Sequence, residues 1–255
     1  MKKITYIILF LATLFISSCS VYEDIYFMEN GSVKYQTAID ASEFMALSGK
    51  SSVDMNGKMP EDTLISFSEL LKDTLKTISP ELEQDIKNIE PLFMRMESSK
   101  EQQTFKISIY GDFKDVQSLS DAFNSMNKLQ NYIKVQQGKN PKLFSNDYFS
   151  HTPFTWDGKT LKRNVIVSDT KDEKPLDEEN ADGSSGNLDE TMSTSFKRLF
   201  SQGQMIVRYH FPTKIKSISN DKATFSMDGK TAIINYPGLL FIEPEEELGI
   251  EIVTE

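Results

Sequence analysis

The sequence predicts an α+β fold, with helices packed on one face of an antiparallel sheet. Short segments in which apolar and polar residues alternate, as in half-buried strands, recur along the chain and are separated by turn-forming residues. Residues 64–89 and 116–129 instead carry apolar side chains at helical spacing. Strands that follow one another through short turns favour an antiparallel sheet, and the interspersed helices then cover one of its faces. A signal segment precedes this body.

The chain begins with a secretory signal. Lys2 and Lys3 precede an apolar run at residues 4–16, and small residues follow before Cys19. A basic start, a short apolar stretch and small residues before a cleavage site are typical of such a signal, and the run is too short for an ordinary membrane span. We therefore expect residues 1–18 to be removed as a signal peptide.

The sequence Ile16-Ser17-Ser18-Cys19 resembles the lipobox of bacterial lipoproteins, in which an aliphatic residue and two small residues precede the cysteine that becomes the new N-terminus. The resemblance implies that Cys19 is the lipidation site, where two or three acyl chains anchor the protein far more firmly than one chain would. In such proteins an aspartate directly after the cysteine causes retention in the inner membrane. Ser20 occupies that position here, and the absence of the aspartate implies transport to the outer membrane. The alternative is an ordinary secretory signal followed by an unrelated cysteine.

Residues 19–30 are expected to form a lipidated tether between the membrane and the folded body. Within them, Glu23 and Asp24 resemble the acidic signal that sends some lipoproteins of the Bacteroidota to the cell surface. Two acids also occur together by chance in an acidic chain, so the sequence leaves open whether the body faces the periplasm or the surface.

The composition is acidic, with 38 Asp and Glu against 28 Lys and Arg and a net charge of −10. Removal of Lys2 and Lys3 with the signal peptide leaves 26 basic residues against 38 acidic ones, a net charge of −12. We expect no nucleic-acid partner, because binding a polyanion needs clustered basic side chains. Cys19 is the sole cysteine, so packing and not a disulfide must stabilise the mature chain.

Residues 31–167 are predicted to form the N-terminal part of the α+β domain. Ser79-Pro80 separates two helices, because proline ends one helix and suits the first turn of the next. The polar residues 98–103 form the turn of a hairpin. The elements expected here are a first strand at residues 31–40, helices at 64–78 and 80–90, strands at 92–97 and 104–110, and a helix at 116–129.

Residues 168–190 are predicted to be a disordered acidic insert, because nine carboxylates accompany Lys171 and Lys174 and large apolar side chains are few. Five residues of this insert approximately match the spacing of the ligands in a calcium-binding loop. A glutamate replaces the first aspartate of such a loop and an aspartate replaces its final glutamate, so we expect a solvated linker and no metal site. These five residues are Glu178, Asn180, Asp182, Gly183 and Asp189.

Residues 191–255 are predicted to be a β-rich C-terminal part, of the same domain or of a second small one. A short helix around residues 194–200 and strands at 205–211, 223–227, 231–236 and 248–253 are expected. The tetrapeptide Asp-Gly-Lys-Thr occurs at residues 157–160 and again at residues 228–231, and each copy separates two strand-like runs. Asp-Gly suits the positive φ of a tight turn, so we expect two hairpins; an internal repeat is the alternative.

No sequence pattern indicates catalysis. His151 and His210 are the only histidines, and no HExxH, GxSxG, paired-cysteine or glycine-rich phosphate-binding pattern occurs. We therefore expect no catalytic, cofactor-binding or metal-binding residue, and we expect His210, near a strand end, to make structural hydrogen bonds. An envelope hydrolase is the alternative, which would need a cleft where a histidine meets acids with perturbed pKa values.

A C-terminal pattern suggests a further resemblance. The run Val207-Arg208-Tyr209-His210-Phe211-Pro212, the run Lys214-Ile215-Lys216-Ser217 and the tetrapeptide at residues 228–231 are similar to the strand, Phe-Pro turn and strand pattern of LppM-like bacterial lipoproteins. The resemblance implies an envelope protein with an α+β domain able to hold lipid or glycolipid. It identifies no catalytic residue in this chain.

Together these features predict a lipid-anchored cell-envelope protein with a non-enzymatic binding role. Its partners would be the membrane, through the anchor, and a hydrophobic, glycolipid or glycan ligand or an envelope protein. The 11 methionines and 17 phenylalanines can line an adaptable cavity or fill an irregular core. A cavity between helices and sheet would favour the apolar ligand, whereas an exposed apolar patch without a cavity would favour a surface-displayed protein-interaction module.

Overall fold

A computed structural model describes residues 20–42, 62–72, 80–99, 101–102, 104–137, 152–166, 197–198 and 200–255. The predicted signal peptide at residues 1–18, Cys19, His151 and the acidic insert at residues 168–190 lie outside the described residues. The helix expected around residues 194–200 lies mostly outside them as well.

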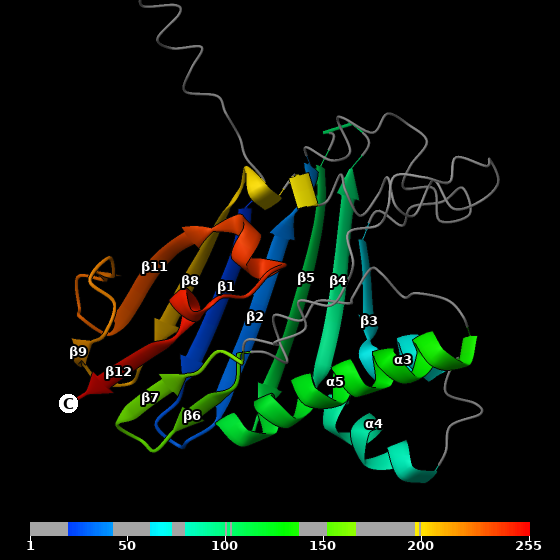
Figure 1. The fold of residues 1–255 in the computed structure, drawn as a ribbon, viewed down its shortest axis with the longest axis horizontal. Helices are drawn as coiled ribbons and strands as arrows, with labels where there is room; N and C mark the ends of the chain where they lie inside the picture. The colour runs from blue at the N-terminus through cyan, green and yellow to red at the C-terminus, as the bar shows by residue number, and fades with distance from the viewer. Residues whose placement is uncertain are drawn as a thin grey trace, which may run out of the picture.

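An eight-stranded sheet forms the centre of the fold (Figure 1), with the strand order β10-β11-β8-β1-β2-β5-β4-β3. All neighbours are antiparallel except β1 and β8, which run parallel. The strands are β1 (Ser20–Phe27), β2 (Val33–Asp40), β3 (Asp62–Ser66), β4 (Leu92–Ser99), β5 (Thr104–Phe113), β8 (Gln204–His210), β10 (Thr224–Phe225) and β11 (Thr231–Pro237). The predicted α+β class with an antiparallel-dominated sheet is confirmed.

Helices and a second, smaller sheet lie against one face of the main sheet (Figure 1). The helices are α3 (Phe67–Lys72), α4 (Glu83–Ile89) and α5 (Val116–Gln137), with 3-10 turns at Pro80–Leu82, Gly238–Phe241 and Glu246–Leu248. The small sheet has the order β6-β7-β12-β9, from β6 (Phe154–Trp156), β7 (Thr160–Arg163), β9 (Ile215–Ile218) and β12 (Ile250–Thr254). Helices on one face were predicted, whereas the second sheet was not.

Buried side chains from these layers pack against one another. Alternate residues of the central strands point toward the covered face and are fully or almost fully buried, as expected for half-buried strands. They pack with the apolar side of α5 in one continuous core. Its members include Val21, Ile25, Phe27, Val33, Tyr35, Met94, Ile109, Phe113, Leu119, Phe123, Met126, Leu129, Met205, Val207, Tyr209 and Ile234. Methionine and phenylalanine thus fill a core in the described part of the chain.

The N-terminal segment corrects the sequence analysis. We expected residues 19–30 to be a tether, but Ser20–Phe27 form β1, which is paired on both sides, with β2 and with β8. Val21, Ile25 and Phe27 are buried in the core. The alternation was hidden because Glu23 occupies an inward position where an apolar residue is usual. The strand at residues 33–40 is consequently the second of the described fold, and Ser20 already belongs to the main sheet.

The segment after residue 61 also differs from expectation. Helical spacing predicted one helix at residues 64–78, but Asp62–Ser66 form edge strand β3 and the helix begins only at Phe67. The Ser66 hydroxyl explains this boundary, because its Oγ accepts a hydrogen bond from the backbone N–H of Glu69 at 3.1 Å, as an N-cap does. Leu64 therefore lies in a strand and is 59% exposed.

The two Asp-Gly turns form as predicted. Gly158 has a φ of +95° between β6 and β7, and Gly229 has a φ of +70° between β10 and β11. The hairpin of β4 and β5 and the helix that begins at Val116 are also confirmed, although α5 extends to Gln137. Strands from before and after residues 168–190 occur in both sheets, so residues 31–167 and 191–255 build these sheets together.

Candidate functional site

The candidate site is the face of the main sheet opposite α5 and the small sheet, which we call the open face. Within the described ranges, no helix or strand lies over it (Figure 1). The register of the strands brings polar and aromatic side chains together there. Asp24 on β1 lies opposite Gln36 on β2, and Gln36 lies opposite Tyr110 on β5. Two residues after Asp24 on β1, Tyr26 lies opposite His210 on β8.

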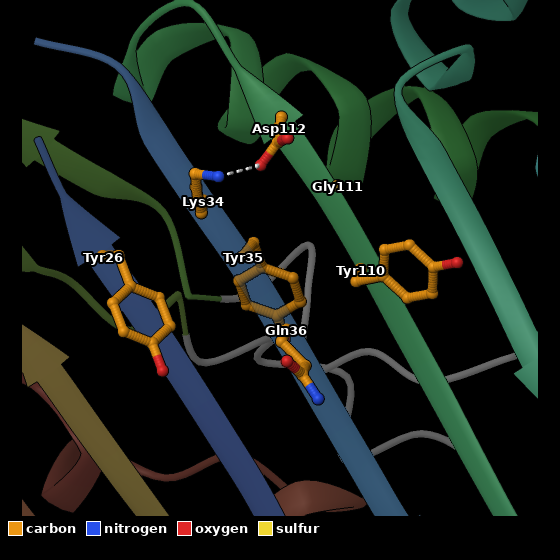
Figure 2. A pocket seen from close by; sticks show the side chains of 7 residues that line it. All are labelled: Tyr26, Lys34, Tyr35, Gln36, Tyr110, Gly111 and Asp112. Carbon is orange, nitrogen blue, oxygen red and sulfur yellow. Dashed lines mark ion pairs between the residues drawn. The ribbon is translucent and has the colours of Figure 1, made fainter.

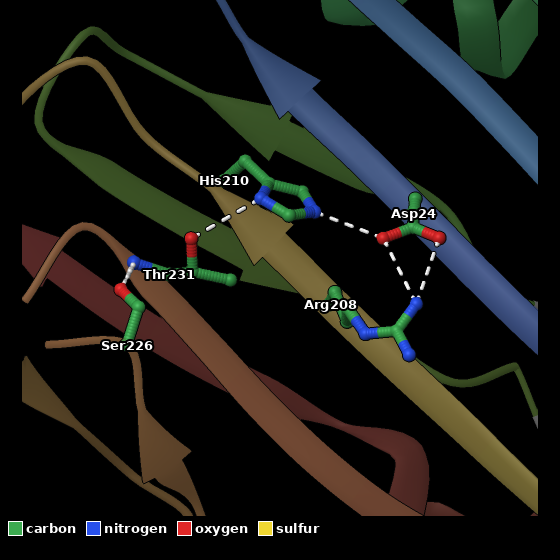
Figure 3. Close-up of polar contacts among 5 residues, drawn as sticks. All are labelled: Asp24, Arg208, His210, Ser226 and Thr231. Carbon is green, nitrogen blue, oxygen red and sulfur yellow. Dashed lines mark hydrogen bonds and ion pairs between the residues drawn. The ribbon is translucent and has the colours of Figure 1, made fainter.

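A polar cluster joins β1 to its parallel neighbour β8 (Figure 3). Arg208 Nη1 lies 3.1 Å from Asp24 Oδ2, and His210 Nε2 lies 2.9 Å from Asp24 Oδ1. The other ring nitrogen of His210, Nδ1, lies 3.1 Å from the hydroxyl oxygen of Thr231 on β11. The Tyr26 ring stacks on the imidazole, with centroids 4.0 Å apart and ring planes 6° apart. The expectation that His210 is hydrogen-bonded is confirmed.

The surroundings of Asp24 and Tyr26 shift the pKa values of these two groups in opposite directions. Burial would raise the pKa of Asp24, but the hydrogen bond to His210 and the charge of Arg208 outweigh it and hold that pKa below its ordinary value. Asp24 is therefore ionised at neutral pH. Burial and the negative charge of Asp24 raise the pKa of Tyr26, so its phenol remains protonated and able to donate a hydrogen bond.

Replacing Asp24→Asn should lower the free energy of unfolding by about 1 kcal/mol at pH 7. Because the folded-state pKa of Asp24 lies below its unfolded value, its contribution is present above about pH 4 and is lost as pH falls through the folded pKa. Urea unfolding at pH 7 and at pH 3 measures the difference, which should shrink at the lower pH. The exposed Asp112→Asn is the control, with an effect within about 0.5 kcal/mol. A loss for Asp24→Asn that does not change with pH would contradict the account.

The chain of Asp24, His210 and Thr231 has the order of acid, base and hydroxyl found in hydrolases. Two contacts argue for a structural network instead. Asp24 is shared with Arg208, and the Thr231 N–H donates to Ser226 Oγ at 3.0 Å, so this amide is not available to stabilise an oxyanion (Figure 3). We interpret the cluster as a structure that fixes β1 against β8 and holds Tyr26 in place.

A pocket of about 210 Å³ lies next to the cluster on the open face (Figure 2). Tyr26 and Tyr110 stand on either side of it, and Gln36 lies between them on β2. Lys34 and Asp112 form an ion pair at its rim, with Nζ and Oδ1 3.7 Å apart. The remaining lining residues are Tyr35 and Gly111. This volume is smaller than the roughly 300–1,000 Å³ of pockets for drug-sized ligands, and suits one ring-sized group.

A second charged network lies buried between the two sheets and was not found by sequence reasoning. Arg163 on β7 and Glu23 on β1 are both 0% exposed, with Nη1 and Oε2 2.7 Å apart. The guanidinium also donates to the hydroxyl of Tyr209 at 2.9 Å and to that of Thr152 at 3.2 Å. Tyr35 donates its hydroxyl to Glu23 Oε1 at 3.0 Å, and burial and the Glu23 charge hold the pKa of that phenol well above its ordinary value. This network links β1 to the small sheet.

Comparisons with known proteins do not assign a function to this chain. No family profile matches the chain, and no curated protein sequence matches it. A solved structure to which the chain is similar is the NMR structure of the folded domain of LppM from Mycobacterium tuberculosis. The match covers 92% of this chain and 89% of that one, at 7% identity and a TM-score of 0.39. A likeness this weak leaves the function to be argued from the residues themselves.

The remaining predictions concern the lipidation site, metal binding and membrane spans. Cys19, the predicted lipidation site, precedes the first described residue, Ser20. Among the described residues, no group of three or more His, Cys, Asp or Glu side chains could hold a metal ion. None of the helices in the described ranges is both long and apolar enough to cross a membrane. The open-face residues were missed, although alternation along residues 20–27 would have placed Tyr22, Asp24 and Tyr26 on one face.

Proposed function

We propose that the chain is a lipid-anchored protein of the bacterial outer membrane that binds a glycan-bearing ligand or an envelope protein through its open face, without catalysis. One observation carries the binding role. The described part of the chain leaves a face of the main sheet uncovered, and on it a pocket lies between two tyrosines beside an ordered polar cluster. Concave sites with aromatic walls and a few fixed polar groups are typical of ligand recognition.

The lipobox residues before Ser20 support the anchor. Since β1 begins at Ser20, a lipidated Cys19 would adjoin the folded body directly, and the N-terminal end of β1 would face the membrane. Tyr26 would then stand roughly 20 Å further from the anchor, at the ordinary rise of a strand. The open-face cluster would thus be held near the membrane but clear of its surface.

The packing of the core favours the open face over an apolar cavity as the binding surface. Buried side chains of the main sheet and α5 pack in one cluster, which is the site where the cavity interpretation would place a lipid. The open face is mixed in character, with tyrosines next to charged pairs, and this suits a polar ligand with apolar faces better than a lipid tail.

Fractionation of cells tests the anchor. The native protein should enter the outer-membrane fraction and carry a diacylglycerol mass on Cys19, whereas a version with an ordinary cleavable signal before Ser20 should be released by osmotic shock. Native protein without acyl mass, or the second version still bound to membrane, would contradict the proposal.

Binding to isolated cell envelopes tests the open face, using the version without the anchor. Replacing Tyr26 and Tyr110 with serine should abolish the binding. The control replaces Phe225 and Met227, which are 49% and 108% exposed but lie outside the pocket, and should leave it unchanged. If both double variants bound the envelopes equally well, the open face would not be the binding surface.

A further inference from the structure

We infer that the pocket between Tyr26 and Tyr110 is a subsite for one ring of an uncharged sugar. This inference rests on the proposed function, since it names the chemical class of the ligand that the open face would bind. Three features of the described residues carry it: the outward-turned tyrosine rings, the polar group between them, and the pairing of the charges around them.

The two tyrosines lie on the strands that flank β2, and both line the pocket (Figure 2). These strands are roughly 10 Å apart at ordinary strand spacing. The imidazole of His210 stacks on the Tyr26 ring, and the Phe93 ring lies beside that of Tyr110, with centroids 5.9 Å and planes 17° apart. Figure 2 shows both tyrosine rings nearly face-on in a view onto the strands, so their faces are turned outward from the sheet and not toward each other.

Such rings suit the C–H face of a sugar. A sugar ring has one apolar face and a rim of hydroxyls, and the electron-rich face of an aromatic ring attracts its C–H groups. Tyr26 is 37% exposed, so burial against a ligand would remove apolar area from water. His210 and Phe93 contact the two tyrosine rings and restrict their movement, so little side-chain freedom is lost on binding.

The polar group between the tyrosines matches hydroxyls. Gln36 lines the pocket, and its amide offers both a donor and an acceptor. Sugar hydroxyls also donate and accept, so one amide can engage two adjacent hydroxyls. Tyr26, kept protonated by burial and by the charge of Asp24, adds a phenolic donor at the pocket wall.

The charges around the pocket are already paired. Lys34 pairs with Asp112 at the rim, and Arg208 pairs with Asp24 behind Tyr26. A charged ligand would have to compete with the partner that already lies against the opposite charge. The net charge of −10 adds a general repulsion against anionic polymers. An uncharged sugar meets neither penalty.

Calorimetric titration of the lipidated full-length protein, in a detergent without a sugar head group, tests the inference. The ligands are uncharged gluco-, manno- and galacto-configured oligosaccharides, with an oligogalacturonate as the anionic comparison. At least one uncharged series should bind with a Kd on the order of 1 mM per ring, and the oligogalacturonate at least about tenfold more weakly. Tyr26→Ala, Tyr110→Ala and Gln36→Ala should each weaken binding about tenfold or more.

Two controls separate recognition from folding. Tyr26→Phe keeps the ring but removes the phenolic donor, so it should weaken binding less than Tyr26→Ala does, and Phe225→Ala removes an exposed ring outside the pocket and should change nothing. Tighter binding of the oligogalacturonate, or uncharged binding that survives Tyr26→Ala, would overturn the inference. If no sugar binds while the open-face variants still lose envelope binding, the sugar subsite is wrong and the binding face stands. If envelope binding also persists in those variants, both are wrong.

Discussion

A chain that begins at residue 31, without β1, is expected to be unfolded. This deletion would be harmless if the segment were a tether, but β1 lies between β2 and β8 and bonds to both. It buries Val21, Ile25 and Phe27, whose transfer from water contributes roughly 5–9 kcal/mol. That loss is comparable to the whole stability of an ordinary domain, which is about 5–15 kcal/mol.

Circular dichroism and urea unfolding of chains that begin at Ser20 and at residue 31 compare the two expectations. The longer chain should unfold cooperatively, whereas the shorter one should lack a cooperative transition. A shorter chain with the same transition midpoint as the longer one would show that residues 20–30 are a tether after all.

Replacing Arg163→Met should cost about 3–5 kcal/mol of unfolding free energy, because it leaves Glu23 buried without its counter-charge. Tyr209 and Thr152 lose a donor at the same time. The double variant Glu23→Leu with Arg163→Met removes both charges and should recover most of this loss. Equilibrium urea unfolding of the single and double variants measures the coupling between the two side chains.

Arg95→Met provides the matched control for Arg163→Met. Arg95 also forms a bidentate pair, with Asp62 at 2.9 and 2.8 Å, but its side chain is 44% exposed and that of Asp62 is 56% exposed. Its loss should lower the free energy of unfolding far less than Arg163→Met does, because both groups remain solvated. If the two arginine variants were equally stable, the buried pair would not be the connection that holds β1 to the small sheet.

The parts of the fold that the sequence could predict depend on neighbours in the chain. Asp-Gly turns fix two hairpins because Gly158 and Gly229 adopt positive φ, and the 3.6-residue period reveals α5. β3 was missed because Leu64 continues the apolar spacing of the following helix, and only the Ser66 cap marks the boundary. Local sequence patterns therefore predict the turns, but they do not predict where β3 ends and α3 begins.

The parts that could not be predicted depend on pairing between distant segments. β1 looked like a tether because Glu23 interrupts its apolar face, and the reason for that acid is Arg163, which is 140 residues away. Asp24 resembled a sorting signal, whereas its partners Arg208 and His210 lie beyond residue 200. A parallel pair such as β1 and β8 leaves no turn between the strands to indicate it.

The central claim is that recognition uses the open face and not a cavity beneath the sheet. Native mass spectrometry of the body that begins at Ser20, followed by solvent extraction, tests this claim most directly. The body should be produced in the bacterial cytoplasm and offered envelope lipids afterwards. The filled core predicts the mass of the polypeptide alone, with no lipid retained and none taken up. A retained lipid that solvent extraction releases would contradict the account and locate the binding site inside the fold.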